Sequence, residues 1–227
     1  MTDLDRFVET FLNPALAQKT WPAIANGVLV TVEVALAVVA TGLALGLALA
    51  YLRAYRIRPL NALIIVLVDV FRAVPPLVII LIAYFGLPNV GVTLSAFAVL
   101  WLVLSLVLAA FSEEILWAGI LSVRKGQWDA ARSTGLTFGE TLRTVILPQA
   151  FRLAIPPLTN RTIAITKNTA LGSVIGVAEI INQAQTAVAV TGNATPLMMA
   201  AVAYLLVFIP VLALAGRIER RFAWNRA

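Results

Sequence analysis

The sequence predicts an all-α, polytopic membrane protein that crosses the bilayer with five helices. Hydrophobic residues make up 61% of the 227 positions and charged residues only 12%, well below the charged fraction of soluble domains. A surface this apolar needs lipid around it. A backbone in lipid has to satisfy its hydrogen bonds within the segment, which favours helices. Barrel strands would show short segments of alternating polarity, and none stands out.

Five apolar stretches approach or exceed the roughly 20 residues that span the hydrocarbon of a bilayer. They cover about residues 25–52, 60–87, 92–110, 151–181 and 196–216. Pro75-Pro76 is expected to break the second stretch. The fourth is the least apolar, because Arg161 and Lys167 lie in it. The acidic first ten residues do not resemble a secretory signal, so we expect residues 1–227 to form one transmembrane domain.

The distribution of Lys and Arg predicts the orientation. Twelve of the 17 fall on one side of the five predicted spans, and only Arg6 and Lys19 fall on the other. Basic loops face the cytoplasm, so we expect an external N-terminus, a cytoplasmic C-terminus and a large cytoplasmic loop at about 113–150. The twelve are Arg53, Arg56, Arg58, Arg124, Lys125, Arg132, Arg143, Arg152, Arg217, Arg220, Arg221 and Arg226.

Composition also limits the chemistry. The chain has no Cys and no His, which removes disulfides, the commonest metal ligand and the usual general base. We assign no catalytic and no metal-ligating residue. The net charge of +6 is explained by basic loops on an anionic leaflet, so no nucleic-acid partner is expected. The phosphate-binding pattern G-x-x-x-x-G-K-[ST] is missing, so any ATP would be bound by another polypeptide.

The large loop contains a spaced motif: Asp129-Ala130-Ala131, then Gly135, then Leu147-Pro148. Residues 127–133 can form a short helix with small side chains on one side, and Gly135 is a natural stop for it. Such a helix could be a docking surface for a partner. The alternative is an amphipathic helix that lies on the membrane.

This motif resembles the E-A-A, G, I-x-L-P loop of the permease subunits of bacterial ATP-binding-cassette importers. The spacing agrees at every element, with Asp129 in place of Glu and Val145 in place of Ile. Further segments resemble the polar amino acid group of these permeases, and the likeness covers roughly residues 20–220. These segments are Phe71–Leu77 (FRAVPPL), Lys125-Gly126-Gln127, Ile146–Ala150 (ILPQA), Pro156–Asn160 (PPLTN) and Lys167–Leu171 (KNTAL).

The resemblance implies the fold of a type I importer permease in the bacterial inner membrane, with a cytoplasmic coupling helix between the third and fourth spans. It implies ATP-driven import of a polar amino acid or similar zwitterion by alternating access. The implied partners are two ATPase subunits that carry ATP and Mg, a second permease subunit (identical or homologous), an external substrate-binding protein and membrane lipid. The residues expected to couple to the ATPase are Gly126, Gln127, Asp129, Ala130, Ala131, Gly135, Leu147 and Pro148.

Charges within the spans are costly in hydrocarbon, so Glu33, Asp69, Arg72, Arg161 and Lys167 are expected to pair, reach water or line a wet cavity. Asp69 and Arg72 share a helix face and can pair, either as a structural ion pair or as a lining for a zwitterion. Lys167 has no acid three or four residues away, which favours a role in the path. The expected substrate-path residues are Asp69, Arg72, Pro75, Glu114, Lys167, Asn168 and Thr169.

One departure from the family pattern concerns the third span. Val107 and Phe111 stand where members often carry Asn and Tyr, so two polar groups are missing at membrane depth. The alternative functions are a secondary transporter and a membrane enzyme. A self-contained secondary transporter would need its own coupling-ion site, usually from internal repeats. A membrane enzyme would need clustered catalytic groups, for which Glu113-Glu114 and scattered acids are the only material.

Overall fold

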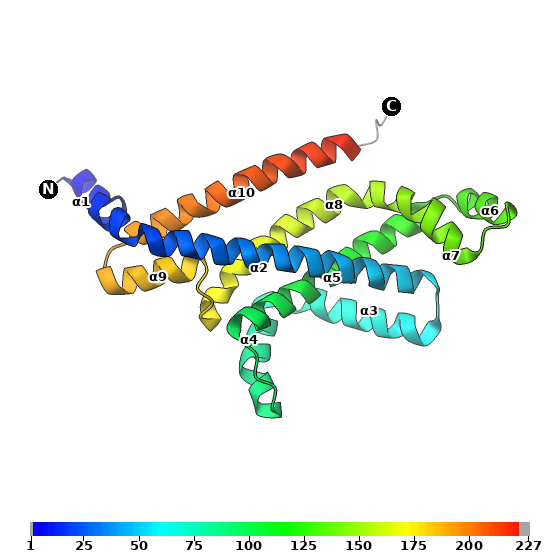
Figure 1. Ribbon diagram of the computed structural model, residues 1–227, viewed down its shortest axis with the longest axis horizontal. Helices are drawn as coiled ribbons and strands as arrows, with labels where there is room; N and C mark the ends of the chain where they lie inside the picture. The colour runs from blue at the N-terminus through cyan, green and yellow to red at the C-terminus, as the bar shows by residue number, and fades with distance from the viewer. Residues whose placement is uncertain (1, 223–227) are drawn as a thin grey trace. The chain divides into compact units, whose positions relative to one another are not determined.

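The computed structural model describes residues 2–222 and is helical, with no strand in that range (Figure 1). Helical stretches long and apolar enough to cross a membrane are Asp3–Ala54, Ala96–Ser122, Phe138–Thr191 and Thr195–Phe222. A bent pair, Arg58–Ala73 with Pro76–Val90, makes a fifth candidate. The all-α membrane fold is therefore confirmed. Arg226, part of the predicted basic C-terminal cluster, lies outside the described residues.

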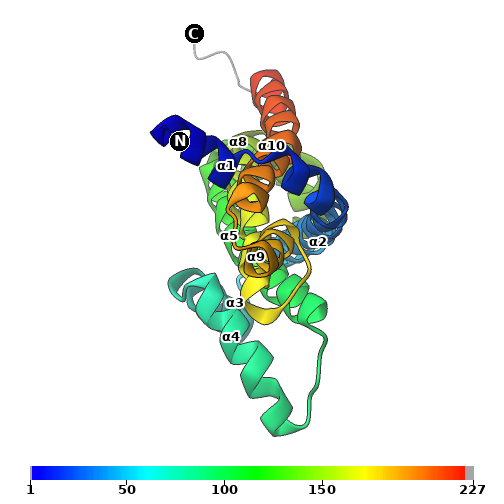
Figure 2. The ribbon, with the colours of Figure 1, turned by 90° about the vertical axis from the view of Figure 1, so that its left-hand side faces the viewer.

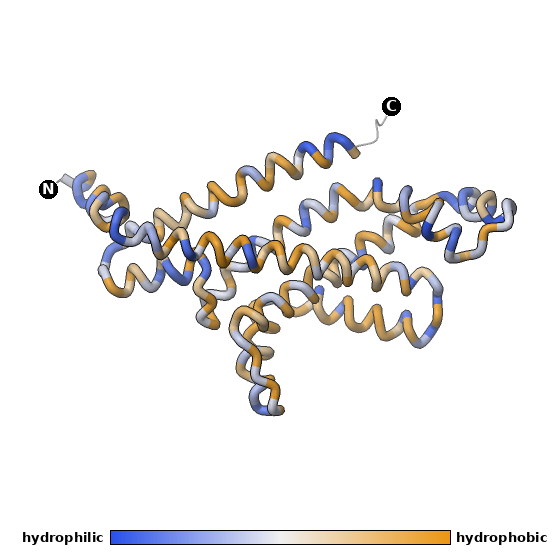
Figure 3. Tube along the Cα trace, viewed as in Figure 1, coloured by the Kyte–Doolittle hydropathy of each residue, from blue (hydrophilic) through white to orange (hydrophobic). Residues whose placement is uncertain are grey.

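Hydropathy follows these stretches along the chain (Figure 3). Helix α10 (Thr195–Phe222) is hydrophobic over most of its length, and its last turns, with Arg220 and Arg221, are hydrophilic. The short helix α6 (Lys125–Ser133) is hydrophilic. Polar residues thus gather at the ends of the long helices, as expected when only the helix ends reach water.

Contacts divide the chain into two compact units, each assembled from three separate stretches of sequence. The first unit comprises the chain up to Val38, Pro76–Leu104 and Thr166–Ala213. The second comprises Val39–Pro75, Ser105–Ile165 and the chain from Leu214 onward.

The first unit packs the N-terminal part of α2 (Pro14–Ala54) against α9 (Ile180–Thr191) and α10, and Figures 1 and 2 show these helices side by side. A side chain at Gly27 would place its Cβ 2.9 Å from the Cα of Ile180, so glycine lets the backbones meet. The unit also holds α1 (Asp3–Phe11), α4 (Pro76–Gly86), η1 (Leu87–Val90), the start of α5 (Ala96–Ser122) and η3 (Asn168–Ile175). Its core side chains are Ile24, Ile180, Ala184, Ala200 and Ala203.

Helix α1 is tied to the start of α10 by hydrogen bonds across the whole length of the sequence. The side-chain amide of Asn193 donates to the carbonyl of Glu9 at 2.9 Å. The amide of Ala194 donates to the carbonyl of Thr10 at 3.1 Å, and the amide of Asn13 donates to the hydroxyl of Thr195 at 3.1 Å. These bonds satisfy backbone groups where α1 ends.

The second unit packs the remainder of α2 against the remainder of α5. A Cβ at Gly46 would lie 2.5 Å from the Cβ of Ser112, and one at Gly42 would lie 2.8 Å from the Cβ of Leu108. Glycines four residues apart let two helices approach closely in lipid. The hydroxyls of Thr41 and Ser105, 2.6 Å apart, share a hydrogen bond in the same seam.

The second unit also holds α3 (Arg58–Ala73), α6, α7 (Phe138–Thr141), the π-helical segment η2 (Leu142–Ile146), α8 (Leu147–Lys167) as far as Ile165, and the last turns of α10 from Leu214. The π-helical turn directly precedes Pro148, which has no amide hydrogen to donate into an α-helix. The side chain of Gln149 donates to the carbonyl of Val145 at 2.8 Å, so this irregular turn keeps a hydrogen bond.

The predicted break in the second span is confirmed. Helix α3 ends at Ala73 and α4 begins at Pro76, so the helix is interrupted at Val74 and Pro75. Val74 has an extended backbone, at ψ 131°, as the residue before a proline prefers. Pro76 opens α4, where its missing amide hydrogen costs little.

Two predicted boundaries are wrong. The third span does not end near residue 110, because α5 continues to Ser122. The large loop therefore begins after Ser122 rather than near 113. The fourth stretch, 151–181, is not one helix: α8 ends at Lys167, the 3₁₀ segment η3 follows, and Gly176 turns the chain at φ +79° before α9.

Candidate functional site

The most concentrated set of charges is an alternating network in the second unit. Arg53, the penultimate residue of α2, lies 2.9 Å from Glu113 and 3.8 Å from Glu114 on α5. Arg72, on α3, lies 3.1 Å from Glu114 and 3.7 Å from Asp69. Acids and bases thus alternate from Glu113 through Arg53, Glu114 and Arg72 to Asp69, so each charge has an opposite neighbour.

The network runs from a buried end to an exposed end. The side chain of Glu113 is 0% exposed and that of Arg53 is 14% exposed. At the other end, Arg72 is 33% exposed, Glu114 40% and Asp69 63%. The close packing of Gly42 and Gly46 against α5 sets the register that brings Arg53 to Glu113. The buried end is therefore a structural anchor, and the exposed end has charges of both signs available to a ligand.

The ring of Phe111 contacts Arg72 of this network and one further cation, Arg161. The guanidinium carbon of Arg161, on α8, lies 3.9 Å from the ring centroid of Phe111, and that of Arg72 lies 5.7 Å from it. Both distances fall in the range of cation–π contacts. The face of the Phe111 ring therefore contacts two guanidinium groups.

The structure brings together only part of the predicted substrate path. Asp69, Arg72 and Glu114 meet in the second unit, whose first stretch ends at Pro75. The predicted Asp69–Arg72 pair is confirmed, although Glu114 is the nearer partner of Arg72.

The remaining predicted path residues, Lys167, Asn168 and Thr169, belong to the first unit. Lys167 is exposed, and its Nζ lies 5.9 Å from the ring centroid of Phe208. Thr169 is buried, and its hydroxyl donates to the carbonyl of Thr166 at 2.9 Å. Thr169 therefore closes a local turn and has no free hydroxyl hydrogen to offer a ligand.

Sequence reasoning missed Arg53, Glu113 and the contact between Arg161 and Phe111. The distribution of charge along the sequence predicts Arg53 in a basic loop, and Glu113 in the same loop as Glu114. Gly42 and Gly46, four residues apart in the first span, were the signal that could have located the close contact between α2 and α5. That contact brings the ends of the first and third spans together.

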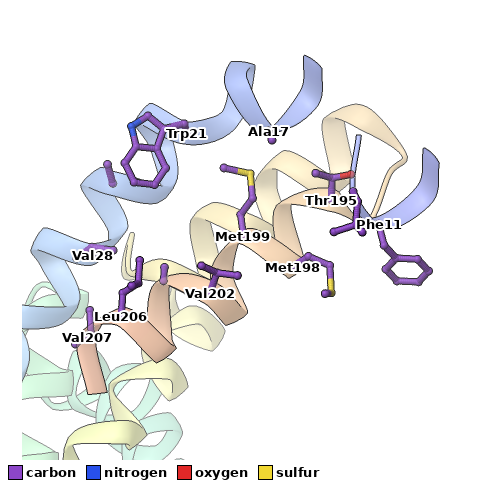
Figure 4. Close-up of a pocket in the computed structure, with 13 residues that line it drawn as sticks. Phe11, Ala17, Trp21, Val28, Thr195, Met198, Met199, Val202, Leu206 and Val207 are labelled. Atoms are coloured by element: carbon purple, nitrogen blue, oxygen red, sulfur yellow. The ribbon is translucent and has the colours of Figure 1, made fainter. Parts of the chain in front are cut away.

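A groove of about 690 Å³ in the first unit is a poor site for a charged ligand (Figure 4). Trp21 and Val28 of α2 line it, with Met199 and Leu206 of α10. Thr195 is the one polar side chain in its lining. An amino acid zwitterion would lose its hydration there without gaining partners, so the charged network is the better candidate.

The predicted helix in the large loop is confirmed as α6, and Gly135 follows its C-terminal cap with φ +92°. The two alanines do not share a surface, because Ala130 is exposed whereas Ala131 is buried. Successive helical residues point about 100° apart, which explains the difference. Gly126, Gln127 and Asp129 are exposed with Ala130.

A row of aromatic rings connects α6 to the end of α2. Trp128 stacks on Phe138 at 5.4 Å between centroids, Phe138 meets the edge of Tyr55 at 5.3 Å, and Tyr55 meets Tyr51 at 5.5 Å. The two tyrosine hydroxyls are 2.9 Å apart. This hydrogen bond raises the pKa of the Tyr55 phenol.

The second part of the predicted loop motif lies where η2 passes into α8. Leu147 is buried in the hydrophobic cluster around Ile120, Leu142 and Ile146, whereas Pro148 is exposed. The side chain of Gln149 donates to that of Gln127 at 3.3 Å. The two parts of the motif are therefore in contact through glutamines.

Known proteins share this architecture. A solved structure described as an amino acid ABC transporter with histidines matches with a TM-score of 0.81 and 33% identity, over 89% of this chain and 95% of that one. An inward-facing structure of the MetNI methionine ABC transporter matches with a TM-score of 0.73 over 89% of this chain and 97% of that one. At 21% identity, this second likeness supports the fold alone.

Relatives with similar sequences are also named as transport permeases. The L-cystine transport system permease protein TcyB of Bacillus subtilis (strain 168) is 40% identical over 74% of this chain and 72% of its own length. The arginine transport system permease protein ArtQ of the same organism is 32% identical over 90% and 94%. The glutamine transport system permease protein GlnP of Escherichia coli (strain K12) is 33% identical over 88% and 94%.

The family model for the inner membrane component of binding-protein-dependent transport systems matches residues 42–224. That range includes the whole charged network and all of α6. The expected resemblance is thus confirmed, and the chain belongs to the family of inner membrane components of binding-protein-dependent transport systems.

Proposed function

We propose that this chain is one of two permease subunits of an ATP-driven importer that takes up a polar amino acid by alternating access. The observation that carries the proposal is the exposed end of the charged network. Arg72 can meet a substrate carboxylate, and Asp69 and Glu114 can meet an ammonium group. The relatives named for cystine, arginine and glutamine transport support a zwitterionic substrate.

Coupling is assigned to the exposed face of α6. Gly126, Gln127, Asp129 and Ala130 present small and polar groups there, and Gly135 ends the helix sharply. Two ATPase subunits would dock on this face and bind ATP and Mg themselves. An external binding protein would deliver the substrate, and a second permease subunit would complete the path.

The test begins with the assembly purified from its native membrane in mild detergent. Mass spectrometry identifies the subunits that co-purify, and reconstitution into vesicles measures uptake of labelled amino acids with ATP inside. We expect uptake that requires ATP and the binding protein. Accumulation by the chain alone, driven by an ion gradient, would support a secondary transporter instead.

The path assignment is tested separately with Arg72→Gln. Loss of one charge-assisted hydrogen bond of roughly 1.5–3 kcal/mol predicts uptake about 10- to 150-fold lower at subsaturating substrate. Lys19→Gln is the matched control, because it removes an exposed cation far along α2 from the network. Equal uptake by the two variants would remove Arg72 from the path and leave the transport function standing.

A further inference from the structure

A pocket of about 510 Å³ in the second unit lies where the ends of α2 and α5 meet α6. Ala54 and Arg56 line it from the end of α2 and the turn that follows, and Phe138 lines it from α7. Trp117, Ile120 and Leu121 line it from the last turns of α5, and Val123 directly follows that helix. Two candidate membrane spans, the stretches Asp3–Ala54 and Ala96–Ser122, end beside this pocket.

Three cations surround this pocket without a partner. Arg56, Lys125 and Arg132 line it, and none of them forms an ion pair within residues 2–222. Asp129 is the one acid in the lining. By contrast, Arg53 and Arg72 in the same unit are both paired. The pocket therefore has an excess positive charge that nothing in the described chain neutralises.

Arg56 is held in an unusual backbone conformation at the pocket. Its φ is +56°, the one positive value for a residue other than glycine between residues 2 and 222. A left-handed conformation is unfavourable for a residue with a Cβ. Its amide donates to the carbonyl of Arg53 at 3.1 Å, so the turn that ends α2 imposes this conformation.

The rest of the lining is apolar and aromatic. Trp117, Ile120 and Leu121 come from α5 and Trp128 from α6, and Leu121 is 55% exposed. A pocket with cationic and apolar side chains fits an amphiphile better than a free ion, because a free ion would leave the apolar side chains exposed to water. Tryptophan at the level of lipid headgroups is also typical of membrane proteins.

The pocket occupies a different face of α6 from the proposed docking face. Lys125, Trp128, Asp129 and Arg132 follow helical spacing toward the pocket. Gly126, Gln127 and Ala130 do not line it. Apart from Asp129, the residues of the two faces are separate, so the pocket can be filled while an ATPase is docked.

We propose that this pocket binds the phosphate headgroup of an anionic phospholipid of the surrounding membrane. The predicted orientation places it at the cytoplasmic leaflet, where anionic lipids attract juxtamembrane Lys and Arg. The phosphate contacts Arg56, Lys125 and Arg132, and the apolar part of the lipid covers Leu121 and Trp117. The site is independent of the transported substrate.

The test is native mass spectrometry of the full chain in detergent, titrated with phosphatidylglycerol or phosphatidylcholine. We expect the chain to retain phosphatidylglycerol preferentially. The variant Arg56→Gln/Lys125→Gln/Arg132→Gln should lose that preference, at about fivefold per cation, which corresponds to about 1 kcal/mol each. The control Arg143→Gln/Arg152→Gln/Arg217→Gln removes the same charge from exposed positions outside the pocket and should keep it.

A second variant avoids dependence on the triple substitution. Asp129→Asn removes the one acid of the pocket and should increase retention of phosphatidylglycerol severalfold. An unchanged preference in both pocket variants overturns the proposal, and so does equal loss in the control. Displacement of the lipid by millimolar inorganic phosphate identifies a free-phosphate site instead. An unchanged lipid preference with loss of a co-purifying ATPase identifies a protein contact instead.

Discussion

One guanidinium nitrogen of Arg53 lies 2.9 Å and 3.0 Å from the two carboxylate oxygens of Glu113, whose side chain is fully buried. The pair joins the end of α2 to α5. A buried charge that loses its partner is destabilising, whereas an apolar replacement of both partners is often tolerated.

The first prediction concerns this pair. Arg53→Met should lower the free energy of unfolding by about 3 kcal/mol or more, because it leaves the Glu113 carboxylate buried and unpaired. The double variant Arg53→Met/Glu113→Leu should recover much of that loss. Denaturant titration of the purified chain in detergent measures both. A single variant as stable as the parent would show that water reaches Glu113.

The second prediction concerns the helix seam. Gly46→Ala should destabilise the protein by about 1–3 kcal/mol, typical of overpacking, because its Cβ would lie 2.5 Å from that of Ser112 and 2.9 Å from the carbonyl oxygen of Ala109. Gly86→Ala is the control, since its nearest neighbour would be 3.9 Å away. Thermal unfolding compares the two, and equal midpoints would contradict the seam.

The third prediction concerns orientation. The chain has no Cys, so single cysteines report cleanly. Cysteine at Asp3 should react with a membrane-impermeant maleimide added to intact cells, whereas cysteine at Gly126 should react only after permeabilisation. Both positions are exposed. Labelling of the 126 variant from outside would reverse the predicted topology.

The fourth prediction concerns Gly135. No atom would lie within 4 Å of a Cβ there, but φ is +92°. Gly135→Leu should therefore insert normally and fail to couple ATP hydrolysis to transport, because the turn after α6 is strained. Gly135→Asn should retain more coupling, since Asn tolerates left-handed conformations better. Substrate-stimulated ATPase activity of the reconstituted assembly distinguishes them, and full stimulation in the Leu variant would argue against docking at α6.

The fifth prediction concerns Lys167. Lys167→Met keeps the length of the side chain and removes a charge that is unpaired within the described residues, so the fold should persist and uptake at subsaturating substrate should fall. Lys19→Met, another exposed lysine, should leave uptake unchanged. Normal uptake by the 167 variant would make Lys167 a structural residue.

Features set by local sequence were predicted well. The break at Pro75-Pro76 and the end of α6 near Gly135 follow from backbone rules that need no tertiary partner. The apolar stretches follow from hydropathy. By contrast, α5 runs twelve residues past the predicted end of the third span, because Glu113 and Glu114 are neutralised by Arg53 and Arg72 from other helices. Without knowledge of these ion pairs, two adjacent charged residues are assigned to a loop.

The candidate site was only half predictable for the same reason. Asp69 and Arg72 are three residues apart on one helix, so their pairing could be read from spacing. The link from Arg72 to Glu114 and the burial of Glu113 depend on how α2, α3 and α5 pack. The sequence predicts only the loss of a polar group at Phe111, whereas the face of its ring contacts Arg161.

The hydrogen bonds between α1 and the start of α10 cannot form until nearly the whole chain has been synthesised. Asn13 and Thr195 are separated by 182 positions, and a ribosome that adds about 5–20 residues per second needs roughly 10–40 s to make that stretch. Throughout that interval the carbonyls of Glu9 and Thr10 lack their native donors. The first helix to leave the ribosome is therefore among the last to be fixed in place, and truncation before Asn193 would leave it untethered at the membrane surface.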